Sequence, residues 1–183
     1  MSAGAHLAEA LAAEHDALAA LAAGEPAHNQ LVRARDAYMA SHAETGPRSW
    51  GRLIGGLKMA ILADDGAEAI AREALAETGE AAASPAAAYA RALAAVVLGE
   101  RPDVRDMLAA GDAFERTGRA LAALADSDGA AYADALAEIV TDFASRQTHL
   151  AGVPVADTAL VLERLAAARG MAARPDSPMV PVY

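Results

Sequence analysis

The sequence predicts an all-α protein: about nine short-to-medium antiparallel helices in one alanine-rich bundle, with an extended, proline-containing C-terminal tail packed on it. Three observations favour this fold class. Alanine, the strongest helix former, supplies 54 of the 183 residues. Residues that open helices (Ser, Asp, Pro) and residues that stop them (Gly) recur at short intervals along the chain. No segment longer than four residues alternates apolar and polar side chains as a half-buried strand would.

Each expected helix is bounded by residues that cap or break helices. Ser84 and Pro85 form an N-cap and first-turn pair. An aspartate followed three residues later by a glutamate predicts capping boxes at 65–68 and 112–115. Residue 127 or 128 opens the eighth helix, and a proline at 154 opens the ninth. The expected helices span residues 5–23, 26–45, 49–63, 66–78, 86–98, 102–110, 113–125, 129–149 and 155–169.

Length favours a single helical domain over residues 1–183. Three prolines exclude a helix from residues 170–183, so this tail is expected to run extended, and its apolar side chains should pack across the helices. An exposed docking peptide is the alternative. Alanine buries little area, so the core is thin. Helices must therefore approach closely, or a homodimer must complete the core.

The formal net charge of −10 narrows the classes of partner. Such a field repels phosphate backbones, so no nucleic acid is expected, whereas a basic protein surface would be attracted. The absence of cysteine excludes disulfides and thiolate metal sites. We find neither a signal peptide nor an 18-residue apolar run, so no membrane association and a cytoplasmic location are expected.

Helical phase places three polar side chains on apolar faces. Glu14 falls in the middle of the leucine stripe of the first helix, and Arg35 and His42 lie on the stripe of the second. A buried charge must be paired, so an ion pair between Glu14 and Arg35 that fixes the helix register is the economical prediction. The alternative is a polar pocket for a ligand or for proton transfer.

The segment "GPRSWGRLIGGLK" is the only basic concentration in the chain. Its glycines predict either close approach of two helices or an anion pocket with Trp50 as one wall. The candidate ligand-binding residues are therefore Glu14, Arg35, His42, Arg48, Trp50 and Arg52.

Metal and catalytic motifs are weak. His6 and Glu9 share a helix face, but the Glu-x-x-His repeat of a dinuclear bundle does not recur, so no metal and no cofactor are expected. No nucleophile elbow or phosphate-binding loop occurs. The sequence therefore leans against an enzyme, without deciding the question.

The stretch "RQTHLAGVPVADTALVLERLAAARG" carries several polar residues close together. Arg146 and His149 are expected in the last turn of the eighth helix, where cations are favoured, and Asp157 near the start of the ninth, where a carboxylate is favoured. These positions explain the charges without a reaction, so we expect no active site here.

The last 55 or so residues, "DGAAYADALAEIVTDFASRQTHLAGVPVADTALVLERLAAARGMAARPDSPMVP", resemble the C-terminal region of mostly helical actinobacterial immunity proteins of polymorphic toxin systems. The likeness consists of an alanine-rich helix ending in a charged segment, a second helix, and an apolar tail with "SP" and a final proline. It implies a non-enzymatic protein that binds and neutralises a toxin domain.

Two functional hypotheses follow. The first is a non-catalytic helical module that binds a protein partner, with an immunity protein as its specific form. The second is a small-molecule binding protein or enzyme with a pocket among the first three helices, lined by Glu14, Arg35, His42 and Trp50. A homodimer is compatible with either.

Overall fold

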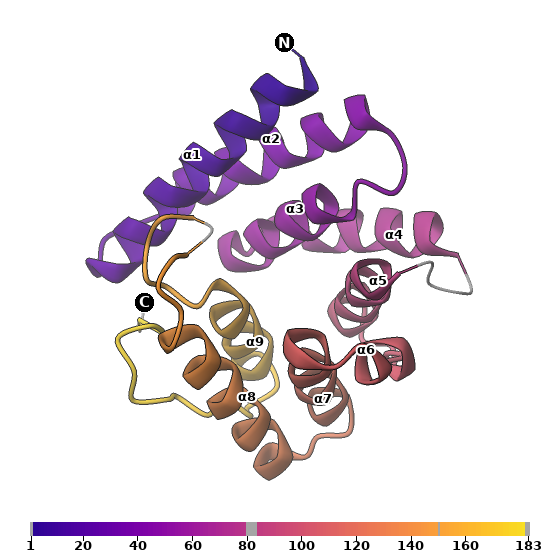
Figure 1. Cartoon of the computed structure of the whole chain (residues 1–183), viewed down its shortest axis with the longest axis vertical. Coiled ribbons are helices and arrows are strands. Elements are labelled where there is room, and N and C mark those ends of the chain that lie inside the picture. The colour runs from indigo at the N-terminus through magenta and orange to yellow at the C-terminus, as the bar shows by residue number, and fades with distance from the viewer. Residues whose placement is uncertain (1, 80–83, 150, 182–183) are drawn as a thin grey trace.

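A computed structural model of the chain describes residues 2–79, 84–149 and 151–181, and confirms the all-α fold class. These residues contain nine helices and no strand (Figure 1). The helices are α1 (Ala3–Ala22), α2 (His28–Thr45), α3 (Trp50–Ala63), α4 (Ala67–Thr78), α5 (Pro85–Val97), α6 (Arg105–Ala110), α7 (Asp112–Ala125), α8 (Gly129–Ala144) and α9 (Asp157–Ala167). No helix in these ranges is long and apolar enough to cross a membrane.

Each helix packs on the next along the chain, and α1 and α2 form an antiparallel hairpin at one end of the molecule (Figure 1). Four of the odd-numbered helices also meet one another: α3 contacts α5 and α9, and α7 contacts the same two. These four helices therefore form the inner part of the bundle. Segments from the middle and the end of the chain come together there.

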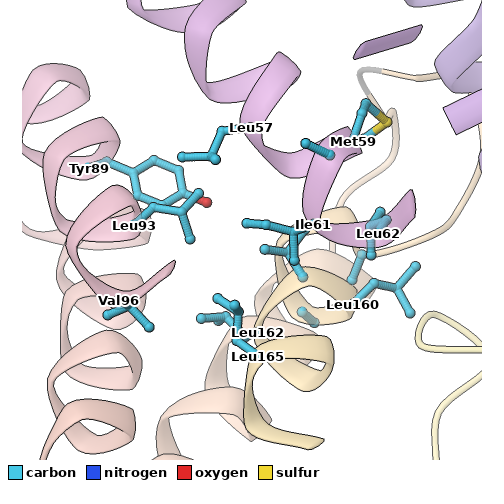
Figure 2. Packing of buried hydrophobic residues seen from close by; sticks show 14 of the residues in the cluster. Leu57, Met59, Ile61, Leu62, Tyr89, Leu93, Val96, Leu160, Leu162 and Leu165 are labelled. Carbon is cyan, nitrogen blue, oxygen red and sulfur yellow. The ribbon is translucent and has the colours of Figure 1, made fainter. Parts of the chain in front are cut away.

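The core between α3, α5 and α9 is built from a modest number of large side chains (Figure 2). Leu57 from α3, Leu93 from α5 and Leu162 from α9 are buried. Alanines fill much of the remaining space, and many of them are fully buried. The small alanine side chain buries little apolar area, so this core depends on close approach of the helix backbones.

Two glycines show how close that approach is. A Cβ atom added at Gly55 of α3 would lie 2.8 Å from the ring of Tyr38 on α2, and one at Gly56 would lie 2.6 Å from the Sδ atom of Met39. A Cβ at Gly51 would meet nothing within 4 Å. The predicted close helix contact is therefore confirmed for Gly55 and Gly56 and does not extend to Gly51.

The capping predictions have mixed outcomes. The side chains of Ser84 and Asp128 accept hydrogen bonds from the first turns of α5 and α8, at 3.2 and 3.0 Å, as predicted. Both predicted capping boxes are wrong. The N-caps of α4 and α7 are Gly66 (φ 75°) and Gly111 (φ 71°), and neither helix has a side-chain cap. Asp65, expected to cap α4, pairs instead with Arg35.

The tail packs on the bundle over its described length. The carboxylate of Glu163 on α9 accepts hydrogen bonds from the backbone amides of Ala173 (3.0 Å) and Arg174 (2.8 Å). The amide of Ala156 donates to the carbonyl of Met179 at 2.8 Å, and Val180 is buried. The predicted non-helical, packed tail is thus confirmed as far as residue 181, but it is not extended throughout, because the amide of Val180 donates to the carbonyl of Ser177 in a turn and Arg174 has φ 50°; residues 182 and 183 lie outside the described part.

Candidate functional site

The predicted ion pair between Glu14 and Arg35 is wrong. Glu14 is buried and accepts a hydrogen bond from the hydroxyl of Tyr38 on α2. Arg35 instead reaches the turn between α3 and α4, where it bonds the carboxylate of Asp65 at 2.6 Å, and it also pairs with Asp36 at 2.7 Å. A phenol satisfies a buried carboxylate without taking a second charge out of water, which is the less costly arrangement.

His42 lies apart from both Glu14 and Arg35. Its Nδ1 atom is 2.6 Å from the hydroxyl of Ser49, and its Nε2 atom is 2.9 Å from Oε1 of Glu77 on α4. It therefore does not meet Glu14, and the predicted three-residue cluster does not form.

The residues around Trp50 are also dispersed. Arg48 is exposed, Arg52 donates a hydrogen bond to the hydroxyl of Ser41 at 2.8 Å, and Trp50 packs, partly buried, against the core. None of the three lines the cavity to which Glu14 contributes. The predicted pocket among the first three helices is thus not assembled from these side chains.

A polar cavity of about 230 Å³ lies instead between α1, α3, α5, α7, α8 and the start of α9. It is smaller than the roughly 300–1,000 Å³ of pockets for drug-sized ligands, so its size suits a small molecule. The side chains that give it chemical character are Glu14, Lys58, Tyr89, Arg116, Asp142, Arg146, His149, Asp157 and Thr158.

One wall of the cavity is an ion pair between distant parts of the chain. The ammonium of Lys58 on α3 donates to the carboxylate of Asp157 at 2.7 Å and to the hydroxyl of Thr158 at 2.8 Å. Burial alone would raise the pKa of Asp157, but the charge and hydrogen bond of Lys58 outweigh it and hold that pKa below its usual value. Burial likewise lowers the pKa of the Lys58 ammonium. The negative charge of Asp157 outweighs this effect and raises that pKa above its usual value. Both groups are therefore held ionised.

The opposite wall carries two arginines around a single carboxylate. Arg116 from α7 and Arg146 lie 2.9 and 2.6 Å from the two oxygens of Asp142 on α8. The hydrogen bond from Arg146, opposed by some burial and reinforced by the charge of Arg116, lowers the pKa of Asp142. Two guanidinium groups thus share one directly bonded carboxylate, and each has a second carboxylate farther away: the charge of Arg146 also acts on Asp157, and that of Arg116 on Glu138.

Phe143 forms an aromatic shelf beside this cluster. The imidazole of His149 stacks on its ring with the centroids 4.7 Å apart, and the guanidinium of Arg146 lies 4.8 Å from the centroid of the same ring. Nδ1 of His149 and Nε of Arg116 are buried and have no hydrogen-bond partner in the described part of the chain. This wall therefore holds unused hydrogen-bonding capacity.

Glu14 lies at the α1 side of the cavity. Burial raises the pKa of its carboxyl, the hydrogen bond from Tyr38 opposes this shift, and the charge of Asp157 adds to it. The raised pKa favours the protonated form of Glu14 and so reduces the negative charge on this side of the cavity.

The cavity is lined in part by residues 145–149 and 151–156, many of which are expected from the sequence to be helical. α8 ends at Ala144 instead of continuing to residue 149, so the prediction that Arg146 and His149 occupy its last turn is wrong. The segment crosses to α1 (Figure 1), where the carbonyl of Ala151 lies 2.8 Å from Nδ1 of His15. Asp157 does lie in the first turn of α9, as predicted.

The C-terminal stretch, in which no active site is expected from the sequence, lines this cavity through Arg146, His149 and Asp157. The clearest sequence signal for this cavity was Lys58, because it is the only lysine of the chain and lies in its least polar segment. Arg146 and His149 were missed because helical phase was extended past the true end of α8.

No protein-family model, curated protein or solved structure matches this chain. The residues that line the cavity therefore indicate which kind of ligand it can bind. It offers cationic donors and an aromatic shelf on one wall and a closed ion pair on the other.

Proposed function

We propose that this protein binds a small organic anion, a carboxylic acid with a short apolar body, in the cavity at the start of α9. The observation that carries the proposal is the sharing of Asp142 by Arg116 and Arg146. A ligand carboxylate placed beside the two guanidinium groups would add a second negative charge next to them and accept charge-assisted hydrogen bonds, including one from Nε of Arg116, which has no partner among the described residues.

The apolar part of the lining supports an apolar body on the ligand. Phe114, Ile139 and Phe143 line the cavity beside the arginines, and Leu18 and Val155 line it further along. A planar or short aliphatic group would rest against these side chains while its carboxylate met the arginines. Binding pockets commonly combine a mostly apolar wall with a few polar groups that orient the ligand.

The test is a binding measurement with a defined set of acids. We expect benzoate, phenylacetate or hexanoate to bind with saturable heat in titration calorimetry, and the matched amides, which keep the shape and lose the charge, to bind much more weakly. Binding of amide and acid with equal affinity would contradict the proposal, as would a lack of binding by all three acids at millimolar concentration.

Arginine variants locate the site. Arg146→Gln and Arg116→Gln each remove one guanidinium that faces the cavity, and each should weaken binding of the acid by about tenfold or more, since a hydrogen bond to a charged group contributes roughly 1.5–3 kcal/mol. Arg33→Gln is the matched control, because Arg33 lies on α2 and pairs with Glu9 at 3.1 Å. Equal affinity in all three variants would place the ligand elsewhere.

A protein-binding role, of the kind an immunity protein plays, is a second proposal. It is supported by the net charge of −10 and by the surface composition, since Leu108 is the only large apolar side chain exposed among the described residues. A partner would then be recognised by charge. Native mass spectrometry of protein purified from its host should show a basic partner of defined mass that dissociates at high salt; a partner retained at high salt would contradict recognition by charge.

A further inference from the structure

We propose that His42, Glu73 and Glu77 form a binding site for one divalent transition-metal ion, such as Zn²⁺, between the C-terminal ends of α2 and α4. One ligand atom from each of the three side chains lies within 4.8 Å of the other two. This site is independent of the cavity at α9.

The hydrogen bonds around His42 are compatible with the tautomer that a metal requires. When the hydroxyl of Ser49 donates to the carbonyl of Gly46 at 3.0 Å, it accepts from Nδ1 of His42 at 2.6 Å. Nδ1 then carries a proton, and in the neutral imidazole the lone pair of Nε2 is directed at Oε1 of Glu77, 2.9 Å away. Two acceptors cannot face each other at that distance without a cation or a proton between them. Histidine ligands of metals are commonly oriented by such a hydrogen bond at the other ring nitrogen.

A second observation concerns Glu77. Its other carboxylate oxygen, Oε2, is buried and has no hydrogen-bond partner in the described part of the chain. An imidazolium at His42 would satisfy only Oε1, and would leave Oε2 and the nearby carboxylate of Glu73 unmatched. A dication bound to a neutral imidazole balances both carboxylates.

The geometry agrees with a small metal ion. Glu73 and Glu77 are four residues apart on α4, so their side chains lie on one face of that helix. Ligand atoms about 2.1 Å from a tetrahedral Zn²⁺ lie about 3.4 Å from one another. Here Nε2 of His42 lies 2.9 Å from Oε1 of Glu77, and the three ligand atoms all lie within 4.8 Å of one another. Modest shifts of the side chains would therefore bring them to the distances that a bound ion requires.

The surrounding backbone also favours a cation. His42 lies in the last turn of α2 and Glu77 in the last turn of α4, where the helix dipoles place partial negative charge. The two helix ends lie on the same side of the molecule (Figure 1). Three protein ligands would leave the fourth position of a tetrahedral ion for water or for a further ligand.

The test uses the untagged full chain, treated with a chelator and then titrated with Zn²⁺ in a calorimeter and with Co²⁺ in an absorption spectrometer. We expect one ion per chain, and d–d bands of cobalt whose intensity reports its coordination number. Failure of both ions to bind in the micromolar range would overturn the proposal and would show that His42 and Glu77 are an imidazolium–carboxylate pair.

Variants separate this site from adventitious binding by other histidines. Glu73 is exposed, so Glu73→Gln should fold normally and should weaken metal binding at least as much as the ~10–100-fold loss typical of an outer-shell change. Ser49→Ala should weaken it by about 10–100-fold through the orientation of His42. Glu68→Gln, on the same helix and paired with Arg72 at 2.7 Å, is the control. Wild-type affinity in Glu73→Gln would overturn the proposal even if metal binds.

Discussion

The ammonium of Lys58 and the carboxylate of Asp157 lie 2.7 Å apart although 99 positions separate them in the chain. This contact joins α3 to the first turn of α9 and forms one wall of the cavity. The side chains are only 12% and 22% exposed, so loss of one partner leaves a largely buried charge without compensation. The ion pair thus connects the stability of the bundle with the shape of the site.

Lys58→Met is expected to lower the free energy of unfolding by about 3–5 kcal/mol, the usual cost of breaking a buried pair. Asp157→Leu combined with Lys58→Met should recover most of that loss, because no unpaired charge remains. Urea unfolding of the single and double variants measures both. A double variant as unstable as the single one would show that shape, and not charge, dominates at this position.

The same pair predicts how stability depends on pH. The folded-state pKa of Asp157 is lowered, with the attraction of Lys58 overcoming burial, so its contribution is present above the ordinary aspartate pKa of about 3.9 and is lost as pH falls through the lower folded value. Asp157→Asn should therefore lose less stability than the wild type below pH 4. Parallel curves of unfolding free energy against pH for the two proteins would contradict this assignment.

The buried carboxyl of Glu14 predicts the opposite dependence of folding stability on pH. Burial raises its folded-state pKa, so its contribution to stability is fully present below the ordinary glutamate pKa of about 4.3 and is lost as pH rises through the folded value. Glu14→Gln retains an acceptor for Tyr38 and should be more stable than the wild type at pH 7, with the difference vanishing at low pH. Tyr38→Phe removes the hydrogen bond and should cost about 1–3 kcal/mol at pH 7. Chemical unfolding at pH 4 and 7 measures both.

Gly55 and Gly51 provide a matched pair for the packing of α3. Gly55→Ala should destabilise by about 1–3 kcal/mol, because the new methyl group collides with the ring of Tyr38. Gly51→Ala meets open space and should stabilise by up to about 1 kcal/mol through helix propensity. Thermal unfolding of the two variants compares them directly. Stabilisation by both would show that α2 and α3 are free to move apart.

Glu163 is expected to hold the C-terminal tail. Its carboxylate accepts from the amides of Ala173 and Arg174 and from the hydroxyl of Tyr132 at 2.7 Å. Glu163→Ala should therefore speed hydrogen exchange across residues 171–181 without unfolding the bundle. Mass spectrometry of the exchanged peptides measures this, and unchanged protection of the tail would show that apolar packing alone holds it.

Most of the fold could be predicted because local signals set the helices. Alanine content, glycine stops and the caps at Ser84 and Asp128 identified all nine helices of the described residues, although the predicted α8 ran five residues too far. The site could not be predicted in this way. Lys58 and Asp157 belong to it only through packing, and no glycine or proline marks the end of α8 at Ala144, after which Ala151 contacts His15 of α1. Helical phase found Glu14 buried but assigned it the wrong partner, since phase gives the face of a helix and not the neighbouring side chain.

The central claim, that the cavity takes a small carboxylate, is tested most directly by NMR of protein labelled at phenylalanine. The chain has two phenylalanines, Phe114 and Phe143, and both line the cavity. Titration with phenylacetate should shift the ring signals of both saturably, the matched amide should not, and Arg116→Gln should weaken the effect. Ring signals that stay in place with every acid, or that move equally with the amide, would contradict the claim.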